Sequence, residues 1–445
     1  MLLLLLVCLL LPQTIAQAAI PSAPIVNAKS VVVMDAHSGQ ILYSKRPEDP
    51  LTTQSLLPML TAMTVTKTHS LQEFLLVDES AGQGRTKIKG PQGGAGLKSG
   101  ERLKISQILS ALLLAQSPDA LRALSSLYPS ETAFLEALQG TINSLNLSQT
   151  KITELFPEKN SPDRTTASDM AKVMQAFTQW PDLLTLANQS SYTFVPNNMV
   201  PEPRVIQNTN LQVVPRSEAA YQKARAGFFS ENLFEDPGNN LFIALASAKD
   251  SEFIVALGHS SNGKEAFSNS KALFDWAFNN YRSEKLIRKG EILSELPLPS
   301  KEVLTLESGE DFYFLDNAKE GEKTNFSLSF KPKEWTGKSI TRHQNMGSAD
   351  ILVRDKVVGS VPLLASKDLT LPQENTASTE PTRPSLPLVL LFFFGVLILL
   401  VLLIRTYNLY RRSLRKGRTL KRQRQRLDLS KKTPEDDDWP KFPRG

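Results

Sequence analysis

Cysteine is almost missing from this chain of 445 residues, which contains only Cys8. Cys8 lies in a leucine-rich run at residues 1–11, and the run is followed by Pro12 and a small-x-small pattern at residues 16–18. This order predicts a secretory signal peptide at residues 1–18, with an uncleaved membrane anchor as the alternative. Removal of the peptide leaves no cysteine, which excludes disulfides and thiol catalysis. Metal-binding and nucleotide-binding motifs are also missing, so we expect neither a metal nor a cofactor.

Charged residues are missing from residues 386–404, an apolar run long enough to cross a bilayer as a helix. Residues 405–432 contain twelve Lys and Arg but one acidic residue, which predicts a cytoplasmic C-terminus. The tail at residues 405–445 holds fourteen basic and five acidic residues, whereas the whole chain has a net charge of only +6. We expect the tail to lie against anionic lipid headgroups. Nucleic-acid binding is disfavoured, because no aromatic residues interleave the basic run.

These patterns predict a single-pass protein of the inner membrane with a large periplasmic part. Residues 27–282 mix helix-like and strand-like patterns, with a hairpin signature at residues 30–44. Helical periodicity covers residues 105–114, 170–177 and 266–278. Residues 283–369 hold short alternating runs that predict a small all-β domain, for example at residues 303–306, 326–330 and 351–353. Residues 370–385 are rich in Pro, Thr, Ser and Glu and predict an extended linker.

Several segments along the outer part match one family of proteins in the same order. They are residues 31–43, 97–102, 162–170, 208–210, 271–276 and 358–363. Together they resemble the D-alanyl-D-alanine carboxypeptidases, the low-molecular-weight penicillin-binding proteins, from about residue 27 to residue 368. The resemblance implies an α/β (α+β) transpeptidase-like domain with an antiparallel sheet and a helical cluster, followed by a β-domain. The implied activity is removal of the terminal D-alanine from peptidoglycan stem peptides through a serine acyl-enzyme.

The first catalytic motif of the family, Ser-x-x-Lys, is altered. Ser55 falls at the nucleophile position, and Pro58 stands where the family has its catalytic lysine. Proline is tolerated in the first turn of a helix, so the change preserves the fold while removing the base. Lys67 lies about 18 Å further along a continuous helix, and His69 lies beyond it, so neither replaces the lysine. An ordinary helix cap is the alternative role for Ser55.

The second motif of the family, Ser-x-Asn, corresponds to Ser117-Pro118-Asp119. Ser117 keeps the hydroxyl. Asp119 replaces an amide by a carboxylate, which accepts hydrogen bonds but cannot donate one to a substrate carbonyl. A loop with a helix cap is the alternative interpretation of this tripeptide.

The third motif of the family, Lys-Thr-Gly, corresponds to Arg225-Ala226-Gly227. Arg225 keeps a positive charge for a carboxylate, Ala226 has lost the hydroxyl, and Gly227 keeps a close backbone approach. A strand with one exposed arginine is the alternative. The second and third motifs face each other in the family, so we expect Asp119 and Arg225 to pair. Matches to these motifs at residues 98–100, 261–264 and 268–271 are out of order and are excluded from the site.

The sequence therefore predicts a membrane-anchored family member with impaired catalysis, which binds peptidoglycan stem peptides or envelope proteins as a pseudoenzyme. Two alternatives stay open. One is an active serine-type carboxypeptidase with a rewired proton relay, in which Ser117 acts with Asp119 as its base. The other is a structural or signalling protein whose outer domains only position the span and the basic tail.

Overall fold

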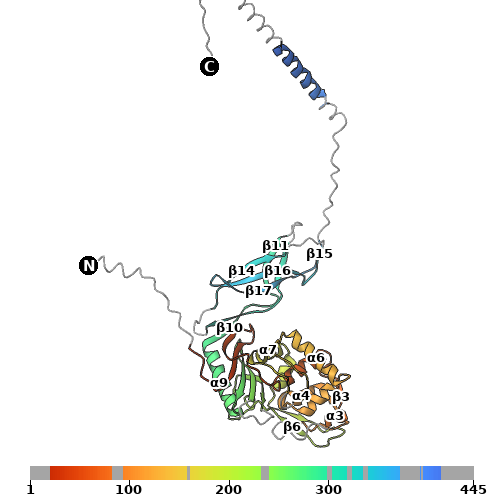
Figure 1. The fold of residues 1–445 in the computed structure, drawn as a ribbon, viewed down its shortest axis with the longest axis vertical. Coiled ribbons are helices and arrows are strands. Elements are labelled where there is room, and N and C mark those ends of the chain that lie inside the picture. Colours follow the sequence, from red (N-terminus) through yellow and green to blue (C-terminus); the bar gives the residue numbers. More distant parts are fainter. Residues whose placement is uncertain are drawn as a thin grey trace, which may run out of the picture. The chain divides into compact units, whose positions relative to one another are not determined.

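The computed structural model describes residues 21–82, 94–157, 161–231, 240–297, 303–317, 323–333, 339–370, 391 and 394–411 (Figure 1). The predicted signal peptide and the tail from residue 412 onward lie outside these described residues. The chain separates into two units, Met1–Thr370 and Leu371–Gly445, and each is described by itself.

A five-stranded antiparallel sheet forms the centre of the first unit, with the strand order β2-β1-β9-β8-β7. The strands are β1 (Ser30–Asp35), β2 (Ile41–Lys45), β7 (Ala224–Ser230), β8 (Asn240–Ala248) and β9 (Ser251–Ser260). Strand β1 is buried along its whole length because its alternating side chains enter two different cores. Val32 and Met34 enter one core, and Val31 and Val33 enter the other. The predicted hairpin of β1 and β2 is confirmed, and β7 forms one edge of the sheet.

Helices cover both faces of this sheet. They are α2 (Leu57–Thr66), α3 (Glu79–Gly82), α4 (Ile105–Ala115), α5 (Pro118–Ser125), α6 (Glu131–Ser144), α7 (Ala167–Phe177), α8 (Pro181–Ala187) and α9 (Gly263–Asn280). Helix α9 packs on β8 and β9, and α7 contacts β1, β8 and β9 from the side of the helical cluster. Helices α4, α7 and α9 confirm the three segments of predicted helical periodicity.

Local sequence signals explain where several of these helices begin. Helices α6, α7 and α9 follow capping side chains that accept a backbone N–H from three residues further on, namely those of Ser130, Thr166 and Asn262. Helices α2, α5 and α8 instead carry a proline in the first turn, namely Pro58, Pro118 and Pro181. The second motif therefore lies at the start of a helix, and so does Pro58 of the first motif.

Two short hairpins flank the helical cluster. Strand β3 (Phe74–Leu76) pairs with β4 (Arg102–Lys104), and β5 (Ser191–Phe194) pairs with β6 (Arg204–Gln207). Helix α4 contacts β4, β5 and β6, and it also packs against α2, α5 and α8. It is therefore the central support of the helical cluster.

Every described element between α9 and Thr370 is a strand, which confirms the expected all-β character of this part. The strands are β10 (Tyr281–Ile287), β11 (Ile292–Pro297), β12 (Val303–Ser308), β13 (Phe312–Asn317), β14 (Phe326–Pro332), β15 (Ser339–Ile340), β16 (Asn345–Val353), β17 (Lys356–Ala365) and β18 (Leu369–Thr370). Five form an antiparallel sheet in the order β11-β12-β17-β16-β14, while β10 pairs with β13 and β15 with β18. The boundary predicted between residues 282 and 283 stays a prediction, because residues 1–370 form one unit.

The second unit contains one helix, Phe394–Arg411, among its described residues. The helix has 18 residues and a mean hydropathy of 1.5, which is long and apolar enough for a membrane span. It extends beyond the end of the predicted span at residues 386–404, and Leu391, within that span, is also helical. Residues 386–390, 392 and 393 lie outside the described part of the chain.

Candidate functional site

The nucleophile position of the first motif lies just before helix α2. Ser55 belongs to the turn that precedes the helix, its side chain is fully buried, and Leu56 is the N-cap residue. The Leu56 position offers no side-chain cap, and Ser55 does not supply one. The interpretation of Ser55 as an ordinary helix cap is therefore wrong, because the serine lies one residue too early.

The hydroxyl of Ser55 has no hydrogen-bond partner among the described residues. Pro58 is buried in the first turn of α2, where its missing N–H leaves no helical hydrogen bond unmade. Lys67 is at the other end of α2 and donates to Thr141 Oγ1 of α6 over 3.0 Å. This position confirms that Lys67 does not replace a base beside Ser55.

Tyr221, shortly before the third motif, is also unsuitable as a substitute base. Its hydroxyl donates to Asp275 Oδ1 over 2.9 Å. Burial, followed by the hydrogen bond and the charge of Asp275, raises the pKa of the Tyr221 phenol above its ordinary value. The phenol therefore stays neutral and keeps its proton at neutral pH.

The second motif is buried and bonded within the protein. Ser117 Oγ donates to Asp119 Oδ1 and accepts the backbone N–H of Ala95 over 2.6 Å. Asp119 Oδ1 also accepts the N–H groups of Ala95 and Ala120, while Oδ2 accepts that of Leu97, each over 2.9 Å. Both polar side chains thus bind the segment formed by residues 94–97, which we call the 94–97 segment.

The 94–97 segment lies too close to Asp119 for a side chain at its first residue. A Cβ atom added to Gly94 would come within 2.8 Å of Asp119 Oδ2. A larger residue at this position would force the backbone away from the carboxylate. Glycine therefore permits the close contact that holds the second motif and the segment together.

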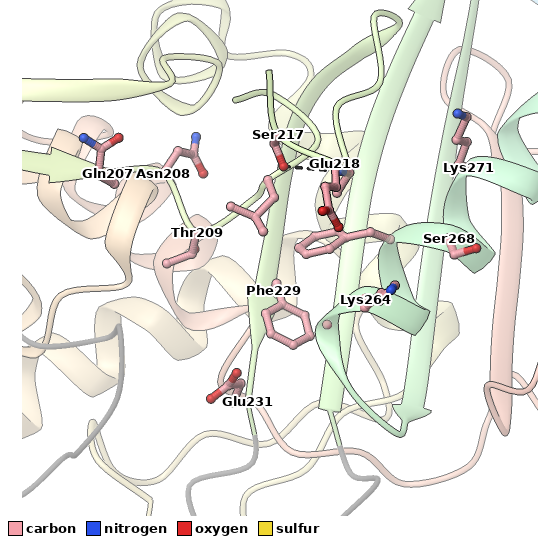
Figure 2. A pocket seen from close by; sticks show the side chains of 14 residues that line it. Gln207, Asn208, Thr209, Ser217, Glu218, Phe229, Glu231, Lys264, Ser268 and Lys271 are labelled. Atoms are coloured by element: carbon pink, nitrogen blue, oxygen red, sulfur yellow. Dashed lines mark hydrogen bonds between the residues drawn. The ribbon is translucent and has the colours of Figure 1, made fainter. Parts of the chain in front are cut away.

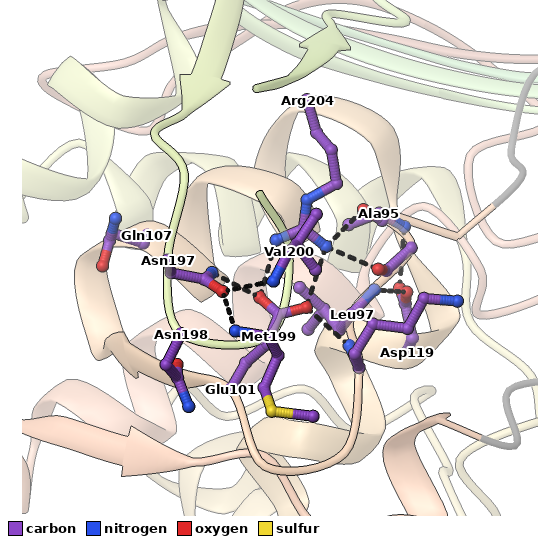
Figure 3. A network of polar contacts seen from close by, with 12 residues as sticks. Ala95, Leu97, Glu101, Gln107, Asp119, Asn197, Asn198, Met199, Val200 and Arg204 are labelled. Atoms are coloured by element: carbon purple, nitrogen blue, oxygen red, sulfur yellow. Dashed lines mark hydrogen bonds and ion pairs between the residues drawn. The ribbon is translucent and has the colours of Figure 1, made fainter. Parts of the chain in front are cut away.

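A buried ion pair holds the 94–97 segment on its other side (Figure 3). Arg204 Nη2 lies 2.6 Å from Oε2 of the fully buried Glu101, and Arg204 Nη1 donates to Oε1 and to the Gly96 carbonyl. Glu101 also accepts the N–H of Lys98 and the amide of Asn197. The charges are thus paired and hydrogen-bonded, as buried charges require.

The third motif lies on the edge strand β7. Arg225 is exposed, and its guanidinium donates to the carbonyls of Gln222 and Ala224. The structure describes both Arg225 and Asp119, and the two side chains form no ion pair. The predicted pairing is therefore wrong. The physical reason is that backbone N–H groups already occupy both oxygens of Asp119.

Gly227 keeps the predicted close approach, although its neighbour is a side chain of this protein. A Cβ atom at Gly227 would lie 2.5 Å from Nδ2 of the fully buried Asn210. Ala226 is also fully buried. The glycine is therefore required by internal packing against the loop before β7.

The structure brings the three motifs onto neighbouring elements around one core. Helix α2 packs against α5, and residues within or beside the motifs, namely Leu56, Ala120 and Ala226, share the same buried cluster. Gln116, in the left-handed conformation, links the second motif to the third. Its side chain donates to the Phe229 carbonyl over 2.6 Å and accepts from Ser230 Oγ over 2.6 Å.

Sequence reasoning missed Gln116, Glu101 and Arg204. Gln116 precedes the second motif directly, and that adjacency was the one available signal. Glu101 and Arg204 are 103 residues apart and belong to no motif. The excluded matches behave as expected, since residues 98–100 form a turn and residues 263–271 lie on α9. No cluster of three metal-ligating side chains occurs in the described part of the chain.

Comparisons with known proteins identify the family of this chain. A family model described as D-alanyl-D-alanine carboxypeptidase matches residues 17–252. The chain belongs to the D-alanyl-D-alanine carboxypeptidase family. This result confirms the family predicted from the sequence, whereas the roles of individual site residues stay predictions.

Curated members of the family include D-alanyl-D-alanine carboxypeptidase DacA of Escherichia coli K12. It is 22% identical over 63% of this chain and 68% of its own length. D-alanyl-D-alanine carboxypeptidase DacF of Bacillus subtilis is 20% identical over 77% of this chain and 86% of its own length. The chain thus spans more than two thirds of both relatives.

Solved structures show the same fold. Penicillin binding protein 5 from Haemophilus influenzae has a TM-score of 0.63 and 18% identity, covering 78% of this chain and 99% of the other. A peptidoglycan synthesis regulatory factor (PBP3) from Streptococcus pneumoniae has a TM-score of 0.59 and 17% identity, with 78% and 100% covered. The penicillin-binding fold predicted from the sequence is confirmed.

Proposed function

We propose that this chain is a membrane-anchored member of the family that binds peptidoglycan stem peptides without hydrolysing them. The observation that carries the proposal is the environment of Ser55. Its hydroxyl is fully buried and has no hydrogen-bond partner among the described residues, and Pro58 stands in place of the lysine. A serine hydroxyl without an adjacent base is a weak nucleophile.

The size of the expected defect follows from general acid–base catalysis. Loss of a positioned base costs roughly a hundred- to ten-thousand-fold in rate. A buried hydroxyl also has to become accessible before it can attack a substrate, so the defect lies at the upper end of this range or beyond. The bonding of Ser117 and Asp119 to the 94–97 segment supports the same conclusion, because neither group is free for a substrate.

The localisation we propose is the inner membrane, with residues 21–370 on the periplasmic side. The apolar helix Phe394–Arg411 supports a single span. The basic tail supports a cytoplasmic C-terminus that contacts anionic lipid headgroups. A span of this kind keeps the folded unit close to the membrane on the side where peptidoglycan is built.

One observation favours a second candidate, an active carboxypeptidase with a rewired relay. Ser117 Oγ donates directly to Asp119 Oδ1, which is the contact of a nucleophile with its base. Against it, Ser117 is fully buried, and the Asp119 carboxylate is already engaged by three backbone N–H groups.

The experiment that tests the proposal measures D-alanine release from a synthetic stem pentapeptide. Penicillin binding protein 5 from Haemophilus influenzae serves as the comparison protein. We expect release by this chain to be indistinguishable from that of its Ser55→Ala variant. Turnover that Ser55→Ala abolishes would contradict the proposal, and turnover that Ser117→Ala abolishes would favour the rewired relay.

A further inference from the structure

A cavity of about 890 Å³ opens beside the edge strand β7, and no residue of the three motifs lines it (Figure 2). Its volume is within the range of small-ligand sites. Three parts of the chain form its walls: the loop after β6, the end of β7 and the first turns of α9. Its lining contains none of Ser55, Ser117, Asp119 and Arg225. The cavity is therefore a separate feature from the altered catalytic site.

The floor of the cavity is apolar and fixed. Phe229 and Phe267 lie with ring centroids 5.5 Å apart, and both are almost fully buried. Gln212, which is buried beneath the loop, donates from Nε2 to the Phe267 carbonyl and to Ser270 Oγ. These bonds attach the loop to α9. The cavity thus needs no large rearrangement before a ligand enters.

Charged side chains of both signs line the walls of this cavity. Lys264 and Lys271 lie two turns apart on α9, which places their side chains on one face about 10 Å apart. Glu218 comes from the loop, and Glu231 follows β7 (Figure 2). Among the described residues, none of the four forms a salt bridge or a side-chain hydrogen bond. Their charges are therefore available to a ligand.

The arrangement specifies the chemistry of the ligand. Ammonium groups on the α9 wall attract carboxylates, and the positive end of the helix dipole near Lys264 adds to this preference. The two glutamates attract an amino group, and the phenylalanine rings bury aliphatic carbon. We propose that this cavity binds a short peptide that carries a free amino group and free carboxylates.

This inference rests on the proposed function and deepens it, because a peptidoglycan stem peptide is a short peptide of this class. It places the stem peptide in this cavity and not at the altered motifs. The charged groups of the motifs support this placement, since Asp119 binds backbone N–H groups and Arg225 binds backbone carbonyls. The cavity charges have no such internal partners in the described part of the chain.

The test measures binding of a synthetic stem tetrapeptide to the full-length chain in detergent by isothermal titration calorimetry. The same peptide is also used with its amino group acetylated, and separately with its carboxylates amidated. We expect the double variant Lys264→Ala, Lys271→Ala to weaken binding by about two- to twenty-five-fold, because each exposed ion pair contributes about 0.2–1 kcal/mol. This variant should also no longer distinguish the amidated peptide from the free one.

Two further variants separate charge from shape. Glu218→Gln with Glu231→Gln should remove the preference for the free amino group over the acetylated one. Ser268→Trp leaves all four charges in place and should block binding by filling the cavity, since Ser268 lines it. Lys356→Ala, at an exposed lysine of β17, is the matched control and should bind as the unchanged chain does.

Three outcomes would overturn the inference. The first is unchanged affinity in the cavity variants, and the second is a loss of binding in Arg225→Ala while the cavity variants still bind. Either result leaves the proposed function standing, and the second moves the ligand to the altered motifs. The third is no binding of any peptide by the unchanged chain. D-alanine release is measured separately, so the absence of hydrolysis is decided independently of all three.

Discussion

Asparagine at residue 119 would restore the residue type of the family's second motif, yet we predict that Asp119→Asn destabilises the chain. Asp119 Oδ1 accepts the N–H groups of Ala95 and Ala120, and Oδ2 accepts that of Leu97. An amide has a single acceptor atom. In either orientation its NH₂ group therefore faces a backbone N–H, and at least one buried donor loses its acceptor.

The magnitude follows from the bonds that are lost. A hydrogen bond to a charged group contributes about 1.5–3 kcal/mol, and an unsatisfied buried donor costs about 1–3 kcal/mol. Because these two figures describe largely the same event, we expect a loss of about 1.5–3 kcal/mol in the free energy of unfolding. At a urea slope of about 2 kcal/mol/M, the unfolding midpoint falls by roughly 0.8–1.5 M.

The assay is equilibrium urea unfolding of a chain that ends at Thr370, which keeps the whole first unit. Asp182→Asn is the matched control, since Asp182 also follows a proline in the first turn of a helix, α8, but is exposed. We expect the control to lose at most about 1 kcal/mol. Equal losses in the two variants would refute the structural role of the Asp119 carboxylate.

Three other substitutions test separate parts of the account. Arg204→Ala should cost about 3 kcal/mol in urea unfolding, because it leaves the carboxylate of Glu101 buried without its cation. Pro58→Lys should not restore labelling by a fluorescent penicillin on a gel, because the Ser55 hydroxyl stays buried. His259→Asn should reduce the loss of thermal stability between pH 7.5 and pH 5, since burial, and then Lys29, lower the pKa of this histidine in the folded state. The unfolded state therefore binds more protons than the folded state. Stability falls as the pH falls through about 6.5, the pKa of a histidine in the unfolded chain.

Two of these substitutions have close controls within the chain. Arg122→Ala removes a guanidinium that, like that of Arg204, lies over a phenylalanine ring. Its partner Glu131 is half exposed, so the loss should stay below about 1 kcal/mol. A loss as large as that of Arg204→Ala would contradict the importance of burial. His343→Asn replaces another histidine with a positive φ, and it also removes the contact of His343 with Glu307.

The sequence was a good guide wherever neighbouring residues decide the structure. The apolar residues of α4 and α9 recur at helical spacing, and the turn between β1 and β2 contains Gly39 with a φ of +72°. The collinear family segments then predicted the order of the elements. These features depend on residues within one or two turns, which a single sequence displays directly.

The sequence could not show the partners of the site residues. Asp119 binds backbone N–H groups 22 and 24 residues before it, and a backbone group carries no sequence signature. The predicted ion pair between Asp119 and Arg225 is wrong because the prediction took account only of the two opposite charges. The backbone N–H groups that compete for the Asp119 carboxylate cannot be recognised from the sequence. The interpretation of Ser55 as a helix cap is wrong by a smaller margin. Helix α2 has its N-cap at Leu56, and a shift of one residue decides whether a serine can cap the helix.

Acylation by penicillin is the sharpest test of whether Ser55 still acts as a nucleophile. The full-length chain is incubated with benzylpenicillin, and its intact mass is measured beside that of penicillin binding protein 5 from Haemophilus influenzae. We expect an adduct on the comparison protein and none on this chain, because Ser55 is buried beside Pro58 without a base. A stoichiometric adduct on this chain, mapped by peptide mass to Ser55, would contradict it.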